Sequence, residues 1–172
     1  MNSHKSLFSP DLYVKSLAHV DFLDLHKKGI RLALLDIDNT LSKHGSVHGG
    51  AYAVEQVARI KSSGVDCLII SNASSKRART FADSLGIPFL PSARKPSRRG
   101  IRTALSMYPD LDRRQLVIIG DQILTDVLAG RRANILTILV DPISQDEATQ
   151  VRIKRPLEKL MKAIFSIKQK DN

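Results

Sequence analysis

Short apolar runs alternate with amphipathic segments of helical length along most of this chain, and few folds accommodate that alternation. Four runs are nearly continuous in apolar residues, at 31–37, 65–70, 115–120 and 135–140, and a shorter one lies near 87–90. Continuous apolar runs indicate strands that are buried on both faces, as in parallel sheets. The segments between them are long enough to cross back over the sheet as helices. We therefore predict an α/β fold in three layers, with helices on both faces of a parallel sheet.

Helices are expected at 51–63, 74–85, 97–108 and 123–132, and a final one from about Pro156. Their apolar residues recur three and four positions apart, which is typical of helices that pack on one face. Gly64 and Gly86 follow the first two, and glycine often ends a helix.

The N-terminal segment carries helix signals of its own. A Ser-Pro pair at 9–10 is typical of a helix start, and apolar residues then recur with helical spacing as far as Val20. Asp21 is expected to cap a second short helix that ends at Gly29. We therefore predict a helical lead-in over 1–29.

No repeat, low-complexity segment or linker interrupts the chain. A chain of 172 residues is long enough for one domain with a substantial core. We predict a single domain over 1–172 that ends in a frayed tail at 168–172.

The charge balance favours anionic partners. The 27 Lys and Arg residues outnumber the 17 Asp and Glu residues, which gives a net charge of +10. Nucleic acid, an anionic membrane surface and phosphorylated substrates all fit that charge, as does a basic surface kept for solubility. No apolar run approaches the roughly 20 residues that span a bilayer. Cys67, the only cysteine, lies in an apolar run and is expected to be buried, so we predict a cytoplasmic protein.

Polar side chains follow four of the predicted strands, at the edge where an open α/β sheet binds ligands. Each group alone is a common turn or helix-start composition, but four such groups at successive strand ends indicate one site. In chain order the groups are Asp36, Asp38 and Thr40; Ser71 and Asn72; Arg94 and Lys95; and Gly120, Asp121 and Asp126.

These residue types fit phosphoryl transfer. Asp36 and Asp38 lie two positions apart, so in extended chain both can face one pocket. One carboxylate can attack phosphorus, and the other can protonate the leaving oxygen and later activate water. Asp36 and Asp121 offer the oxygen ligands that Mg²⁺ prefers. Ser71 and Lys95 can hold the phosphoryl oxygens.

Four segments resemble the four motifs of the haloacid dehalogenase (HAD) superfamily, whose members are mainly Mg²⁺-dependent phosphatases with a Rossmann-like fold. They are "LLDIDNTLS", "IISNAS", "ARKPS" and "VIIGDQILTDVLAG". The resemblance implies a nucleophile at Asp36 and a general acid/base at Asp38. It implies phosphate binding by Thr40, Ser71, Asn72 and Lys95. It also implies Mg²⁺ binding by Asp36, the main-chain carbonyl of Asp38, Asp121 and, directly or through water, Asp126.

Within this superfamily the chain resembles the YqeG-type proteins of subclass IIIA, whose relatives include phosphatidylglycerophosphate phosphatases. The similarity rests on "GDQILTDVLAG", "TILVDPI", "IPFLPSARKP" and "LFSPDLYVKSL" and extends over roughly residues 7–165. Two features depart from the group. The chain has no tryptophan, which the group often carries soon after its first motif, and "TQVRIKR" replaces a Thr-x-x-Asn-Arg pattern.

The spacing of the motifs excludes a cap domain. Only 30 residues separate Thr40 from Ser71 and 23 separate Ser71 from Lys95, and the predicted helices and strands use them. An uncapped site suits a phosphate on a large substrate, such as a lipid headgroup at a membrane. Basic residues near the second and third motifs fit an anionic surface. They are Lys76, Arg77, Arg79, Arg94, Arg98, Arg99 and Arg102.

The leading hypothesis is a Mg²⁺-dependent phosphomonoesterase, an enzyme that dephosphorylates phosphatidylglycerophosphate as a peripheral protein on the cytoplasmic face of the membrane. One alternative is an uncapped phosphatase for a soluble phosphosugar or a nucleic-acid end. Another is a non-catalytic basic module that binds RNA or the ribosome. His44 and His48, in the loop after Thr40, could contact substrate or lie in solvent. The apolar residues of 7–17 could dock on a bilayer, but packing on the sheet is favoured.

Overall fold

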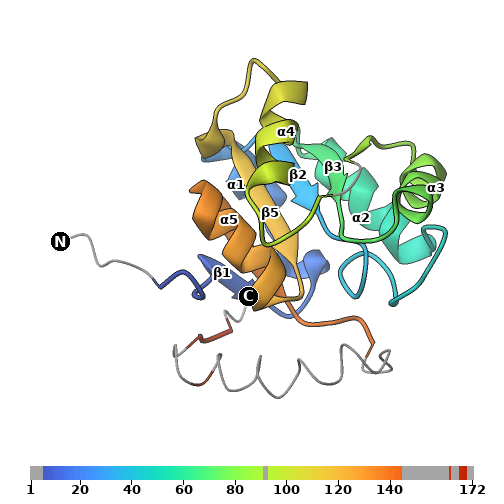
Figure 1. The fold of residues 1–172 in the computed structure, drawn as a ribbon, viewed down its shortest axis with the longest axis horizontal. Coiled ribbons are helices and arrows are strands. Elements are labelled where there is room, and N and C mark those ends of the chain that lie inside the picture. The colour runs from blue at the N-terminus through green and yellow to red at the C-terminus, as the bar shows by residue number, and fades with distance from the viewer. Residues whose placement is uncertain (1–5, 91–92, 145–162, 164–166, 170–172) are drawn as a thin grey trace.

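The structure is a computed structural model that describes residues 6–90, 93–144, 163 and 167–169. Six parallel strands form one sheet in the order β1-β6-β5-β2-β3-β4, and helices lie on both of its faces (Figure 1). The predicted α/β fold is confirmed. The strands are β1 (Leu12–Val14), β2 (Leu32–Leu35), β3 (Asp66–Ile70), β4 (Phe89–Leu90), β5 (Leu116–Gly120) and β6 (Leu136–Val140). The helices are α1 (Phe22–Lys27), α2 (Ala51–Ser62), α3 (Ser75–Leu85), α4 (Arg99–Met107) and α5 (Leu128–Ala133), with short turns η1 (Leu17–His19), η2 (Arg113–Gln115) and η3 (Ile123–Val127).

The central strands are buried on both faces, as their continuous apolar sequences predict. Every residue of β2 and β5 is buried, because successive side chains point to opposite helix layers. Ala33 and Leu35 pack with α1, α2 and α3, while Leu32 and Leu34 pack with α4 and α5. Cys67 is buried and free of any disulfide, as predicted, and burial raises the pKa of its thiol to about 12.

The first part of the predicted helical lead-in is wrong, because residues Leu12–Val14 form strand β1 at the edge of the sheet. β1 pairs in parallel with β6 and covers an edge that would otherwise expose unpaired main-chain groups. The Asp11 carboxylate accepts hydrogen bonds from both the main-chain N–H and the hydroxyl of Thr137, and the Tyr13 hydroxyl donates to Asp141 at 2.5 Å. These long-range bonds outweigh the weak local preference for a helix.

The second part of the lead-in is confirmed. Asp21 caps α1 by accepting a hydrogen bond from the main-chain N–H of Asp24, and Gly29 follows with a φ of 96°. For residues 7–17, packing on the sheet is favoured over docking on a bilayer. This prediction holds in part, since Leu17 is completely buried in the core.

The connections along the carboxyl edge are short. Residues 36–50 join β2 to α2, residues 71–74 join β3 to α3, and no domain is inserted in the connections that the structure describes. The site edge is therefore uncapped there, as expected. None of the helices in the described part of the chain is long and apolar enough to cross a bilayer. The predicted final helix and most of the predicted frayed tail lie outside the described residues.

Gly130 lets α5 pack closely on the sheet. A Cβ atom at this position would lie 2.4 Å from the Thr137 methyl carbon and 2.5 Å from Cγ2 of Ile118. Both methyl groups belong to buried, β-branched strand residues that cannot move aside easily.

We expect Gly130→Ala to lower the free energy of unfolding by about 1–3 kcal/mol, because the added methyl group overpacks the core. Chemical denaturation measures this change. Gly50→Ser is the control, since nothing lies within 4 Å of a Cβ there and serine is a good N-cap for α2. Equal stabilities of the Gly130→Ala variant and the wild type would contradict the close approach.

Candidate active site

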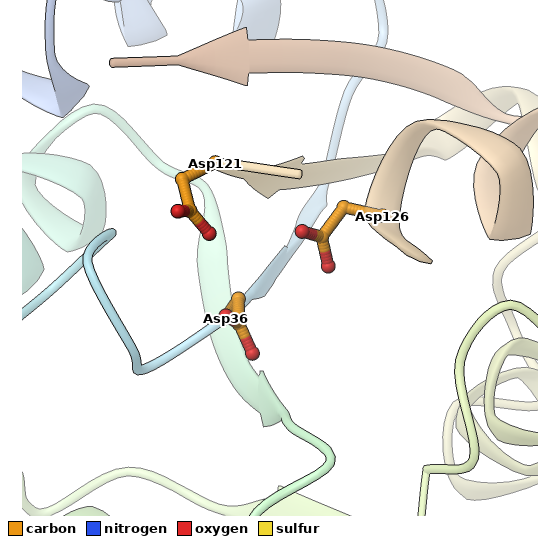
Figure 2. A group of neighbouring side chains, drawn as sticks. All are labelled: Asp36, Asp121 and Asp126. Carbon is orange, nitrogen blue, oxygen red and sulfur yellow. The ribbon is translucent and has the colours of Figure 1, made fainter. Parts of the chain in front are cut away.

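Three aspartates and one lysine converge at the carboxyl edge of the sheet. The lysine is Lys95. Asp36 follows β2, and its main-chain N–H continues the pairing with β5 by donating to the carbonyl of Ile119. Asp121 follows β5, and Asp126 lies in the turn η3 that leads into α5. Figure 2 shows the three side chains close together at the ends of these elements.

The three carboxylates form a buried cluster that fits a divalent cation. One oxygen of each lies within 4.8 Å of the others, and each residue is no more than 5% exposed. Lys95 supplies the only positive charge that the described residues place in direct contact with the cluster, with Nζ 2.6 Å from Asp36 Oδ1 and 2.5 Å from Asp126 Oδ1. Carboxylate oxygens are the ligands that hard divalent cations prefer.

Burial sets the protonation of this cluster. It raises the pKa of Asp36 to about 6, against the opposing effect of Lys95. Although burial alone would lower the pKa of Lys95, Asp126 and Asp36 together raise it. The ammonium therefore stays charged beside the carboxylates.

Gly120 is required for the position of Asp126. A Cβ atom on this glycine would lie 2.1 Å from Asp126 Cγ, so the carboxylate occupies the space that any other residue would fill. Asp126 Oδ2 accepts hydrogen bonds from the Gln122 main-chain N–H at 3.1 Å and from the Thr125 hydroxyl at 3.3 Å. η3 is a π-helical turn, whereas the sequence predicted an ordinary helix there. Asp126 makes these contacts within this turn, just before α5 begins.

Asn72, predicted to bind phosphate, makes a different contact. Its amide donates to the main-chain carbonyl of Lys95 at 2.8 Å, and its side-chain oxygen accepts from the Lys95 main-chain N–H at 2.8 Å. The side chain therefore joins the end of β3 to the segment after β4 and fixes the main chain that carries Lys95.

The two predicted hydroxyl groups lie buried at the same edge. Ser71 is 2% exposed, and its oxygen accepts a hydrogen bond from the Ala73 main-chain N–H at 3.2 Å. Thr40 is 1% exposed, and its hydroxyl has no hydrogen-bond partner among the described residues. A buried hydroxyl without a partner is costly and is expected where a ligand binds.

The carboxylate of Asp38 lies outside the three-carboxylate cluster, in contact with α3. Arg77 forms a two-pronged ion pair with it, the Gly45 main-chain N–H donates to Oδ1 at 2.9 Å, and His44 Nδ1 lies 3.5 Å from the same oxygen. Although burial favours the neutral acid, the Arg77 and Gly45 hydrogen bonds hold the pKa of Asp38 below its usual value. The sequence placed Arg77 near the site but gave no sign that it contacts Asp38.

The main chain turns sharply at Asn39, directly after Asp38. Asn39 has a φ of 58°, a left-handed conformation that asparagine tolerates better than most residues. Its N–H donates to the carbonyl of Ser42 at 2.7 Å and closes the turn. His48, the second loop histidine of the sequence analysis, is exposed.

A parallel sheet with this set of groups at its carboxyl edge is typical of a HAD-type phosphatase. A HAD-hydrolase-like family model matches residues 92–155. The chain is 34% identical over 155 residues to the probable phosphatase YqeG of Bacillus subtilis, and the alignment covers 90% of each chain. The chain therefore belongs to the YqeG-type family of HAD phosphatases.

Two further relatives are named phosphatidylglycerophosphate phosphatase 1. The chloroplastic protein of Chlamydomonas reinhardtii is 29% identical, over 82% of this chain and 55% of its own length. The Arabidopsis thaliana protein is 28% identical, over 87% of this chain and 45% of its own length. This chain spans about half the length of both proteins.

Solved structures support the fold alone. An uncharacterized protein from Listeria monocytogenes serotype 4b aligns with a TM-score of 0.57 at 17% identity, over 78% of this chain and 99% of the other. A hypothetical protein from Xanthomonas campestris aligns with a TM-score of 0.54 at the same identity, over 81% of this chain and 78% of the other.

We predict that Mg²⁺ stabilises the folded protein, because only the folded chain brings the three carboxylates together. At about 100 times the dissociation constant the gain is about 2.7 kcal/mol, which raises Tm by on the order of 5–10 °C. Asp121→Asn should lose this shift, and Asp83→Asn, at an exposed position on α3, should keep it. Calorimetry with and without Mg²⁺ measures both, and an unshifted wild type would contradict the prediction.

Proposed function

We propose that the protein is a Mg²⁺-dependent phosphomonoesterase that works through an aspartyl-phosphate on Asp36. The observation that carries this proposal is the Asp36 carboxylate, held 2.6 Å from Lys95 at the end of a central strand and beside Asp121 and Asp126. A carboxylate that is fixed by one cation and lies close to two further carboxylates, which could bind a metal ion, is suited to attack phosphorus.

The proposed reaction has two steps. In the first, an oxygen of Asp36 attacks phosphorus, the bond from phosphorus to the leaving oxygen breaks, and Asp38 gives that oxygen a proton from its protonated form, which is the minor form while Arg77 holds its pKa low. In the second, water attacks the phosphorus, Asp38 takes a proton from the water, and the bond from phosphorus to Asp36 breaks. Inorganic phosphate then leaves, and Asp38 has regained its proton.

Other residues hold the substrate and the charge. Lys95 is proposed to contact a phosphoryl oxygen as well as Asp36, and Thr40 and Ser71 to donate hydrogen bonds from their hydroxyl groups. Asn72 serves indirectly by fixing the main chain of Lys95. Bound by Asp36, Asp121, Asp126 and the main-chain carbonyl of Asp38, Mg²⁺ would reduce the repulsion between nucleophile and phosphate.

We further propose phosphatidylglycerophosphate as the substrate, on the inner face of a membrane. Two relatives carry this activity in their names. The uncapped edge supports a large substrate, and exposed cations surround it. They are Lys43 after β2, Lys76 in the first turn of α3, and Arg94, Arg98 and Arg99 between β4 and the start of α4. Each Lys or Arg near an anionic leaflet contributes about 1 kcal/mol of attraction.

Two exposed aliphatic side chains lie at the same edge. Val47 is 48% exposed and follows Ser46, whose carbonyl accepts a hydrogen bond from Arg77. Ile143 is 39% exposed, and its N–H donates to the carbonyl of Asn39. Aliphatic side chains beside cations suit a lipid interface, whereas RNA-binding surfaces use flat aromatic rings on which bases stack.

Asp36→Asn should reduce phosphate release by on the order of a thousandfold or more, because the amide is a poor nucleophile. The assay presents phosphatidylglycerophosphate in vesicles with Mg²⁺ and compares it with phosphosugars and with oligonucleotides phosphorylated at either end. Asp83→Asn is the matched control and should keep full activity. Full activity of Asp36→Asn would exclude this nucleophile, and hydrolysis of soluble substrates alone would exclude the lipid. Absence of turnover together with salt-sensitive RNA binding would favour the binding module.

Docking through the catalytic edge has its own test. We expect the double variant Val47→Asp, Ile143→Asp to bind vesicles of phosphatidylglycerol and phosphatidylcholine roughly tenfold or more weakly, since two inserted aliphatic groups are lost. Leu23→Asp is the control, because Leu23 is 54% exposed on α1, which leads into the opposite end of β2. Vesicle co-sedimentation measures binding. Equal losses from both variants, or none, would exclude this edge as the docking surface.

A further inference from the structure

Arg77 joins two parts of the active-site edge. Its guanidinium contacts both carboxylate oxygens of Asp38 and donates to the carbonyl of Ser46 at 3.1 Å. Its main chain is fixed as well, since the Ser74 side chain caps α3 by accepting from the Arg77 N–H at 3.3 Å. The arginine therefore links the helix after β3 to the loop after β2.

This arrangement is more specific than a surface ion pair. The side chain of Arg77 is 19% exposed and that of Asp38 is 14% exposed, so solvent screens the pair only weakly. A planar guanidinium that meets both carboxylate oxygens fixes the direction of the carboxylate as well as its distance. The Gly45 N–H adds a third hydrogen bond to Asp38.

We propose that Arg77 is the positioning residue for Asp38. Asp38 is held outside the three-carboxylate cluster that contains Asp36, in contact with Arg77, Gly45 and His44. Arg77 and the main chain of the loop fix its carboxylate at the mouth of the site, where the leaving oxygen and the attacking water pass. The inference rests on the proposed acid/base role of Asp38.

Positioning through Asp38 differs from two simpler roles of an arginine. An arginine that binds the substrate phosphate would raise KM when removed, with or without Asp38. An arginine that only stabilises the fold would lower Tm and leave kcat of the folded fraction unchanged. A positioning residue lowers kcat at nearly constant KM, and it has no further effect once Asp38 has lost its function.

The test is a double-mutant cycle between Arg77→Gln and Asp38→Asn, with p-nitrophenyl phosphate and Mg²⁺ as the assay. We expect Arg77→Gln to lower kcat by about 10- to 100-fold in the wild-type background, the range for a misplaced catalytic group. In the Asp38→Asn background the same change should lower kcat by less than about twofold. Arg77→Lys should restore activity in part, since lysine keeps the charge without the two-pronged geometry.

Arg79→Gln is the matched control, because it removes an equal charge from the same helix. Arg79 lies over the ring of Phe89, away from Asp38, and its loss should leave kcat unchanged. Thermal unfolding of each variant separates loss of fold from loss of positioning. Independent effects of Arg77 and Asp38, or a change confined to KM, would overturn the inference. Full activity of Asp38→Asn would instead overturn the proposed acid/base role itself.

Discussion

The ammonium group of Lys95 is the interaction on which the rest of the site depends. Three buried carboxylates from separate elements repel one another, and an uncompensated buried charge costs several kcal/mol. Lys95 lies between two of them, at 2.6 Å from Asp36 and 2.5 Å from Asp126. Asn72 holds the main chain of Lys95 in turn, so the ends of β2, β3 and β5 and the segment after β4 are joined through one residue.

Most of the fold could be predicted because its signals are local. Apolar runs that are buried on both faces identify the central strands, and the capping residue Asp21 marks a helix start where the structure has it. The N-terminal strand β1 was missed because it depends on β6, more than a hundred residues away in the chain. Apolar residues do recur with helical spacing from Tyr13 to Val20, but not because the segment is one helix. Leu17 reaches the core from the short turn η1, and Val20 reaches it from the residue after that turn.

The site was predictable to the extent that chemistry follows strand ends. Asp36, Lys95, Asp121 and Asp126 come together because the carboxyl ends of parallel strands meet at one edge. The contacts of Asn72 and Arg77 were not predictable, because each bridges elements whose relative positions no sequence pattern encodes. Asp38 pairs with Arg77 and lies outside the cluster that contains Asp36, although the two aspartates are only two residues apart in the chain.

The absence of a cap over the described edge and the hydrogen-bond network around Asp38 are related. Where no inserted domain covers the described connections, the groups proposed to act on the leaving oxygen must be held by the core domain alone. Arg77 and Gly45 do this from α3 and from the loop after β2. Val47 and Lys43 are exposed on the same loop, so a membrane surface that contacts this loop also contacts the segment that holds Asp38. An interfacial substrate would thus meet the proposed acid/base residue and the proposed docking residues on a single short stretch of chain.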